Sequence, residues 1–230
     1  MAKLLDKTRV YGSLSVDNAI IGNTGFQNMV LFTTGTSVVY TLPASLQVQG
    51  AKFKLTIIGG GAGGATTAAT AGTTGSGGGS GAVIIIILQV ANVFTFTYSV
   101  GAAGASNGAG GLSSVLYNGV TYTAGAGAVA GTGGAVTNVT NGTTPNAIGL
   151  VGFTGGPAGS NSALQNGMGN GGDTPLGYGR GGRHGVTSSA GNVGSNATGY
   201  GAGGGGGKNG SSATARAGGT GAPGLIILQY

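Results

Sequence analysis

The chain has 230 residues, of which 56 are Gly and none is Cys; 5% of the residues are charged and the net charge is +6. The absence of Cys excludes disulfides, iron–sulfur clusters and thiolate metal sites. The positive charges are spread thinly instead of gathering in a stripe or a helix, so we do not expect a nucleic-acid partner.

Residues 1–50 have an ordinary composition and short β patterns. Val10, Leu14 and Val16 share one face of a candidate strand, and apolar and polar residues alternate again over 38–42. Strands this short bury little surface on their own. We therefore expect them to pair with other copies of the chain or with a larger partner, and we interpret residues 1–50 as an N-terminal β segment for attachment and oligomerisation.

Stronger strand patterns begin after residue 50. Phe53, Leu55 and Ile57 alternate with polar residues, which predicts a strand with one buried and one solvent-facing side. The β-branched run at 83–88 predicts a strand that is buried on both sides.

Three more strand patterns follow along the chain. They lie at 94–100, 116–122 and 225–228. Asn118 and Gly119 form the pair that a type I′ hairpin turn prefers. No amphipathic helix is found, so the sequence predicts an all-β fold with a small core of short antiparallel strands and no significant α-helix.

Glycine dominates the chain from residue 51 onwards. Five of the 56 Gly precede that position, which leaves 51 after it. Each Gly in a regular element costs about 0.5–1 kcal/mol relative to Ala, and the low charge argues against disorder. Glycine does permit threefold helices of polyproline-II geometry, which bond sideways to their neighbours. We therefore expect residues 51–230 to form one glycine-rich domain of such helices and loops on the β core.

That geometry predicts Gly at every third position on the inward side of each helix. Runs with this spacing begin at Gly72, Gly149, Gly179, Gly204 and Gly218. Irregular glycine loops are the alternative, because dense glycine also produces such runs by chance. Collagen is excluded, since the repeat is broken and the chain has only five Pro.

Polar stretches interrupt the glycine-rich ones at 135–148, 160–178 and 183–200. We expect them to be loops at the ends of the bundle, because loops on a rigid scaffold often carry recognition. Large side chains stand out in this Gly, Ser and Asn background, and Tyr and Arg are typical interface anchors. They are candidate receptor-binding residues; the alternative is that they cap the bundle. The candidates are Leu164, Met168, Leu176, Tyr178, Arg180, Arg183, His184 and Tyr200.

A dinucleotide-binding motif is incomplete. Gly59, Gly61 and Gly64 spell G-x-G-x-x-G directly after a predicted strand, but the motif also needs an acidic residue about 20 positions further on. No Asp or Glu occurs between Asp17 and Asp173.

The chain has few residues that could support acid–base catalysis or bind a metal. Asp173, His184 and Ser188 could be written as a triad, but a triad is defined by geometry, and a surface His is the simpler interpretation. One His and no Cys argue against a transition-metal site. We therefore expect neither an enzyme, nor a cofactor, nor a bound metal.

Four stretches resemble the glycine-rich receptor-binding regions of tailed-bacteriophage tail fibres. They are KLTIIGGGAGG (54–64), FTYSVGAAG (96–104), GGLSSV (110–115) and GTGAPGLII (219–227). The arrangement covers about residues 50–230 and is similar to the tip adhesins of T-even-like phages. The resemblance implies a polyglycine-II bundle whose variable loops contact the host surface. Residues 8–17 look like the short β segments that begin some trimeric phage fibre proteins.

The first hypothesis is therefore a phage tail-fibre or tip adhesin on the virion surface, extracellular after lysis. The chain start has no secretory apolar core, which fits release by lysis. Residues 1–50 would bind other tail proteins and promote a homotrimer, while the loops bind a host outer-membrane protein or a surface polysaccharide. The alternative is a non-adhesive virion component, such as a head fibre or tail cap. An ice-binding protein is a third hypothesis, against which the polar loops argue.

Overall fold

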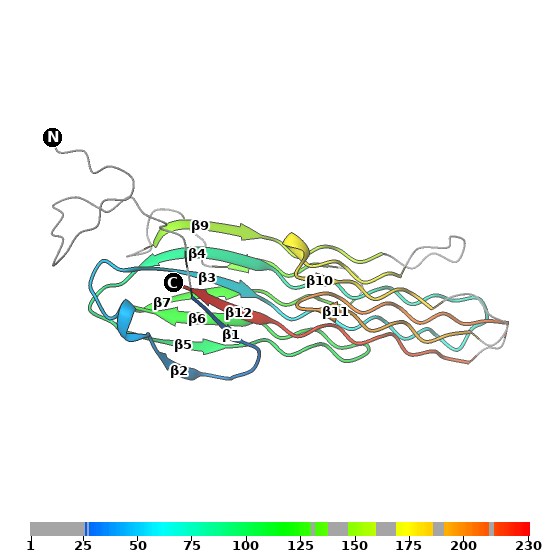
Figure 1. Cartoon of the computed structure of the whole chain (residues 1–230). Helices are drawn as coiled ribbons and strands as arrows, with labels where there is room; N and C mark the ends of the chain where they lie inside the picture. The colour runs from blue at the N-terminus through cyan, green and yellow to red at the C-terminus, as the bar shows by residue number, and fades with distance from the viewer. Residues whose placement is uncertain are drawn as a thin grey trace, which may run out of the picture.

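The computed structural model of the chain describes residues 26, 28–129, 132–137, 147–159, 169–185, 191–211 and 214–230. Its strands form two five-stranded antiparallel sheets and one two-stranded ribbon (Figure 1). The first sheet has the order β1 (Met29–Phe32), β12 (Leu225–Gln229), β3 (Lys52–Ile58), β4 (Val83–Gln89) and β9 (Ala147–Phe153). The second has the order β2 (Val38–Thr41), β5 (Thr95–Ser99), β6 (Ser113–Tyr117), β7 (Val120–Ala124) and β8 (Val136–Thr137).

The ribbon pairs β10 (Gly179–Arg180) with β11 (Thr198–Gly199). The helical elements of the described residues are two short 3-10 turns, η1 (Ala44–Leu46) and η2 (Pro175–Gly177). The prediction of an all-β fold without significant α-helix is therefore confirmed.

The two five-stranded sheets share one hydrophobic core. Ile84, Ile86 and Leu88 of β4 are fully buried in it. Phe53 of β3 meets Tyr117 of β6 edge to face, with ring centroids 5.3 Å apart. Each large apolar side chain buried in this way stabilises the fold by about 1.5–3 kcal/mol.

Two burial patterns differ from the prediction. Thr56 lies on the side of β3 that was predicted to face solvent, yet it is only 1% exposed. It is covered because Ile227 and Ile85 flank it on the neighbouring strands. Strand β4 is not buried on both sides, since Ile85 and Ile87 are only half-buried on its outer face.

The outer face of the first sheet is apolar and partly open. One row of side chains in register crosses all five strands: Leu31, Ile227, Thr56, Ile85 and Val151. Leu31 and Val151, at the two edges of the row, are each 51% exposed.

The turn between β6 and β7 confirms the predicted hairpin. Tyr117 pairs with Val120 across a two-residue turn. Asn118 has φ 46° and Gly119 has φ 78°, and a type I′ turn requires positive φ at both central residues.

The N-terminal strands pair within the chain. β1 pairs with β12 and β2 pairs with β5. The strand predicted at 38–42 therefore has its hydrogen-bond partner within the chain, whereas we expected it to pair with another copy or with a larger partner. The candidate strand at 10–16 lies outside the described residues. The division at residue 50 stays a prediction.

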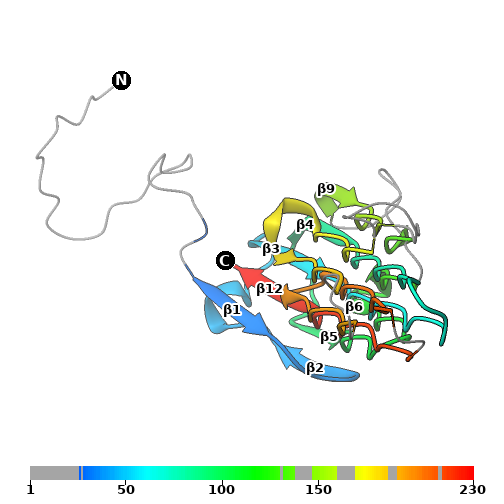
Figure 2. The same cartoon turned by 90° about the vertical axis from the view of Figure 1, so that its right-hand side faces the viewer.

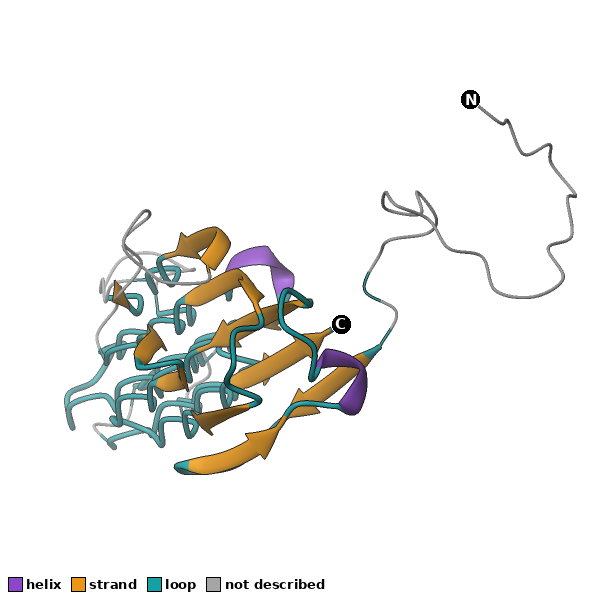
Figure 3. Ribbon diagram, turned by 90° about the vertical axis from the view of Figure 1, so that its left-hand side faces the viewer, coloured by secondary structure: helices purple, strands orange, loops and turns teal. Residues whose placement is uncertain are grey.

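Glycine-rich extended segments, called rods here, leave one end of the sheets and run side by side (Figure 1). Figure 2 shows them end-on as coils in rows, and Figure 3 shows the opposite end, where the sheets and the C-terminus lie. Rod 59–65 sends its backbone N–H groups in three directions in turn. Gly59, Ala62 and Ala65 donate to rod 76–82, Gly60 and Gly63 to rod 108–111, and Gly61 and Gly64 to rod 219–222. The direction repeats every three residues, as polyproline-II geometry requires.

Rods 76–82 and 201–208 obey the same rule. Gly78 and Gly81 donate to the carbonyls of Gly204 and Gly201 over 2.8 and 2.7 Å. In the run predicted from Gly72, every third Gly donates to the chain at 201–210, beginning with Gly72 to Gly210, and these glycines are buried from Gly75 onwards. The first two Gly of the run predicted from Gly149 lie instead in β9.

Close packing explains why the central rods need glycine. A Cβ added to Gly63 would lie 1.9 Å from the carbonyl oxygen of Ala105, and one added to Gly64 would lie 2.0 Å from that of Gly205. Both contacts are with backbone atoms, so no side-chain movement relieves them.

Rods also replace much of the predicted loops. Within 160–178, Gly171 donates to Gly182 and Gly172 to Gly78; within 183–200, Gly194 donates to Ala217. The described parts at 169–172 and 191–197 are therefore bonded rods and not loops. Ser and Asn suffice there because only the inward position of each turn must be small. Most of the predicted loop 135–148 lies outside the described residues.

Candidate functional site

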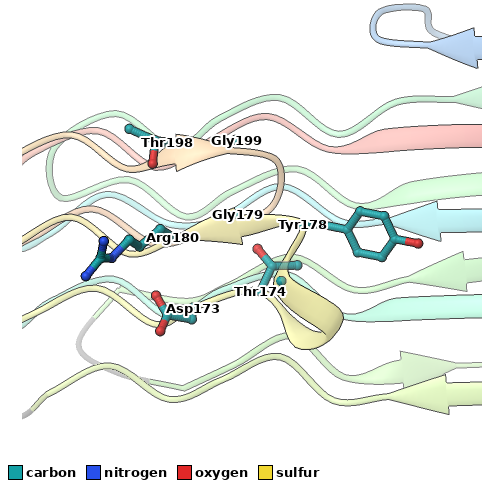
Figure 4. A pocket seen from close by; sticks show the side chains of 8 residues that line it. Asp173, Thr174, Tyr178, Gly179, Arg180, Thr198 and Gly199 are labelled. Atoms are coloured by element: carbon teal, nitrogen blue, oxygen red, sulfur yellow. The ribbon is translucent and has the colours of Figure 1, made fainter.

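A shallow hollow lies on one side of the molecule, where the β10–β11 ribbon meets the first sheet (Figure 4). Its volume is about 570 Å³. Turn η2, the two ribbon strands and the rod before them supply its walls. The lining residues are Asp173, Thr174, Gly177, Tyr178, Gly179, Arg180, Thr198 and Gly199.

Hydrogen bonds between side chains and the backbone fix the ribbon beneath the hollow. Thr174, which is buried, donates its hydroxyl to the carbonyl of Tyr200 over 2.5 Å. The amide of Gly181 donates to Oδ1 of Asp173 over 2.7 Å. The Asp173 carboxylate thus has one oxygen held by the backbone and stays exposed at the surface.

Leu176 is the most unusual residue of the site. It has φ 63° and ψ 13°, in the left-handed region, and its side chain is 55% exposed. This conformation costs a non-glycine residue about 1–2 kcal/mol, and exposure gives Leu no compensating burial. Strained residues of this kind cluster at functional sites.

Tyr178 and Tyr200 lie together but do not form an open aromatic surface. The amide of Tyr200 donates to the carbonyl of Tyr178 over 3.0 Å. Both side chains pack against Ile58, Val83 and Leu225 on the outer face of the first sheet. In Figure 4 the Tyr178 ring points away from Arg180. These two residues therefore attach the ribbon to the sheet.

Arg180 and Arg183 lie on one side of rod 179–185. Both are exposed, whereas Gly182 and Gly185 are buried and donate to the carbonyls of Gly203 and Gly206. Residues three apart share a side in a threefold helix, so the two guanidinium groups leave the same face.

His184 faces the neighbouring rod. Its amide donates to Oδ1 of Asn170 over 3.0 Å, and its Nδ1 lies 3.1 Å from the same oxygen. Partial burial, and then the charge of Lys208, lower the pKa of His184 below its ordinary value. The ring is therefore mostly uncharged at neutral pH.

The structure brings together part of the candidate set. Leu176, Tyr178, Arg180 and Tyr200 lie at the ribbon, while Arg183 and His184 lie further along the bundle. Leu164 and Met168 lie outside the described residues.

Sequence reasoning missed Asp173, Thr174 and Thr198 as lining residues. Asp-Thr-Pro at 173–175 is a recognisable turn signal that could have drawn attention to the first two. Thr198 carries no local signal, because pairing with Arg180 brings it to the hollow.

The part of the chain that the structure describes contains neither a candidate metal site nor a membrane-spanning helix. No group of three or more His, Asp or Glu side chains there could hold a metal ion. Nor does that part contain a helix of the length and hydropathy needed to span a membrane.

The fold and the hollow define a class of protein: an all-β sandwich extended by a glycine-rich bundle that displays polar side chains on its surface. Residues 33–230 match the family model described as a glycine-rich domain, and the chain belongs to that family. A comparison with curated proteins finds none that matches the chain.

Proposed function

We propose that the protein is a bacteriophage tail-fibre or tip adhesin that binds a receptor on the host cell surface. The observation that carries this proposal is Leu176, an exposed apolar side chain held in a strained conformation beside a polar hollow. Neither the strain nor the exposure stabilises the fold. Contact of Leu176 with a ligand would explain both its strained backbone and its exposed side chain.

The bundle supports the proposal as a scaffold. Its rods are held sideways by backbone bonds of 2.7–3.1 Å around rod 201–208, so the surface residues sit on a rigid support. Preorganised sites lose little conformational entropy on binding. Residues 1–50 would attach the protein to other tail proteins and hold a homotrimer. Light scattering tests that state, and a monomer at micromolar concentration would exclude the trimer.

The test of adhesion is binding of the fluorescently labelled full chain to a panel of Gram-negative strains, with and without proteinase treatment of the cells. We expect saturable binding that differs between strains. Leu176→Ser should weaken it, whereas Val48→Ser, which changes an apolar residue 61% exposed on the sheet end, should not. Equal binding by both variants would remove Leu176 from the site, and absence of binding to every strain would argue against an adhesin.

A second candidate is a non-adhesive structural component of the virion. The open apolar row on the first sheet, with Leu31 and Val151 at its edges, favours it, because assembled components bury such faces. This function predicts a fixed copy number in purified particles and no affinity for cells.

A further inference from the structure

One side of the bundle is a continuous surface of three neighbouring rods. Gly171 of rod 169–173 donates to Gly182 of rod 179–185, and Ser195 of rod 191–197 donates to Arg183. The three rods flank rod 201–208. Gly203 of that rod donates to Gly172 and accepts from Gly182, and Gly205 donates to Ser195. Their outward residues are exposed: Asn170, Asp173, Arg180, Arg183, Val193 and Asn196.

Positive charge exceeds negative charge on this surface. Its outward charged residues, among those described, are two arginines and one acidic side chain, Asp173. Arg180 and Arg183 belong to this surface, and Lys208 lies close enough to His184 for its charge to lower the pKa of that ring. Excess positive charge over neighbouring rods favours an anionic partner.

The spacing of the two arginines is set by the backbone. Three residues of a threefold helix advance about 9 Å, and the bonds of Gly182 and Gly185 to rod 201–208 fix that advance. Guanidinium groups bind carboxylates and phosphates through paired hydrogen bonds. Two acidic groups in one extended ligand fit this arrangement.

The neighbouring groups favour a sugar over other anions. Asp173, Thr174 and Thr198 line the hollow beside Arg180, and carboxylate and hydroxyl oxygens are partners for sugar hydroxyls. Single-stranded nucleic acid is favoured by open aromatic platforms, but Tyr178 and Tyr200 pack on the sheet. A protein partner is favoured by a cluster of large apolar or aromatic anchors, whereas among the described residues this surface exposes only two large apolar side chains, Leu176 and Val193.

We propose that this surface, from the hollow at Asp173 and Arg180 along the rod to Arg183, binds an acidic glycan that carries carboxylate or phosphate groups. The two arginines bind the acidic groups, and Asp173 accepts hydrogen bonds from sugar hydroxyls. The inference rests on the proposed function and names the receptor class: a surface glycan, bound on the side of the bundle.

Calorimetric titration of the full chain tests it with four probes: oligogalacturonate, its neutral methyl ester, a mannose 6-phosphate oligosaccharide and neutral oligomannose. We expect an acidic probe to bind and its neutral counterpart not to bind; the two acidic probes distinguish carboxylate from phosphate. Arg180→Gln with Arg183→Gln should reduce the affinity at least tenfold. The matched control, Lys52→Gln with Lys54→Gln, removes the same charge from the sheet and should change the affinity less than twofold.

Three outcomes would overturn the inference: no acidic probe binds, both double variants lose affinity equally, or single-stranded DNA or phosphatidylglycerol vesicles bind as tightly as the glycan. Thermal melts of both double variants verify folding. Cell binding measured in parallel keeps the two proposals distinguishable. If the unmodified chain binds cells but no acidic glycan, the glycan inference fails and the adhesin remains; if it binds the glycan but no cells, the adhesin fails.

Discussion

At some positions the close packing of the rods depends on a single glycine. At Gly63 a Cβ would overlap the backbone of Ala105, while at Gly149 it would meet only Ile87 side-chain atoms, the nearest at 3.8 Å. The same substitution should therefore have opposite effects at the two positions.

We expect Gly63→Ala to lower the free energy of unfolding by about 3 kcal/mol or more, because overpacking against atoms that cannot move lies at the upper end of its usual cost. Gly149→Ala should raise it by about 0.4–1 kcal/mol, since Ala restricts the unfolded chain. Urea denaturation of both variants measures the difference. A tolerated Gly63→Ala would contradict the close approach of rod 59–65 to the backbone of Ala105.

Leu176 offers a second test at the scale of one residue. Leu176→Gly should stabilise the protein by about 1 kcal/mol, because Gly adopts φ near 63° without the penalty. Leu176→Ala keeps the penalty and should leave stability nearly unchanged. Thermal denaturation measures both variants. A gain from Ala equal to that from Gly would show that side-chain exposure, and not backbone strain, is the cost.

At the scale of elements, buried side chains join the turns at the far end of the bundle. Asn209 is 1% exposed, and its Nδ2 donates to the carbonyls of Ala68 and Thr70 while its Oδ1 accepts from the Thr67 hydroxyl over 2.6 Å. One side chain thus holds the turn after rod 59–65 to the end of rod 201–208.

We expect Asn209→Ala to destabilise the protein by about 1–3 kcal/mol, because it removes the acceptor of the buried Thr67 hydroxyl and the partly buried bonds to the Ala68 and Thr70 carbonyls. Asn196→Ala is the matched control. Its Oδ1 accepts from the Thr220 amide over 2.9 Å at an exposed position, so water replaces it at little cost. Chemical denaturation compares the two, and equal losses would contradict the role of burial.

Some structural elements could be predicted from their local sequence, and others could not. Asn118-Gly119 and the alternation at 94–100 are local signals, and the strands were found there. Rod 191–197 was predicted as a loop, because its residues are ordinary Asn, Val and Ser, and the register with Arg183 and Ala217 is non-local. The residues of the hollow were predictable to the same extent. Tyr178 and Arg180 were identified by their residue type, whereas Thr198 lies at the hollow only because it pairs with Arg180.

At the scale of the whole molecule, the sheets and the bundle form one hydrogen-bonded body. Rod 59–65 continues β3, rod 76–82 leads into β4, and the last rod leads into β12, so the central strands and the central rods are the same stretches of chain. Among its described residues the bundle has no large apolar core of its own, and its order comes from backbone bonds between buried segments.

This continuity predicts the pattern of amide hydrogen exchange. Gly60–Gly64 lack regular secondary structure, yet their N–H groups are buried and bonded over 2.8–3.0 Å. Exchange from such groups requires opening of the bundle, so their protection should match that of β3 and β4. The exposed turn residues Thr70 and Ala71 should exchange fast and serve as the internal control. Mass spectrometry of peptides from both regions makes the comparison; rapid exchange at 60–64 with slow exchange in β3 would mean that the bundle opens independently of the sheets.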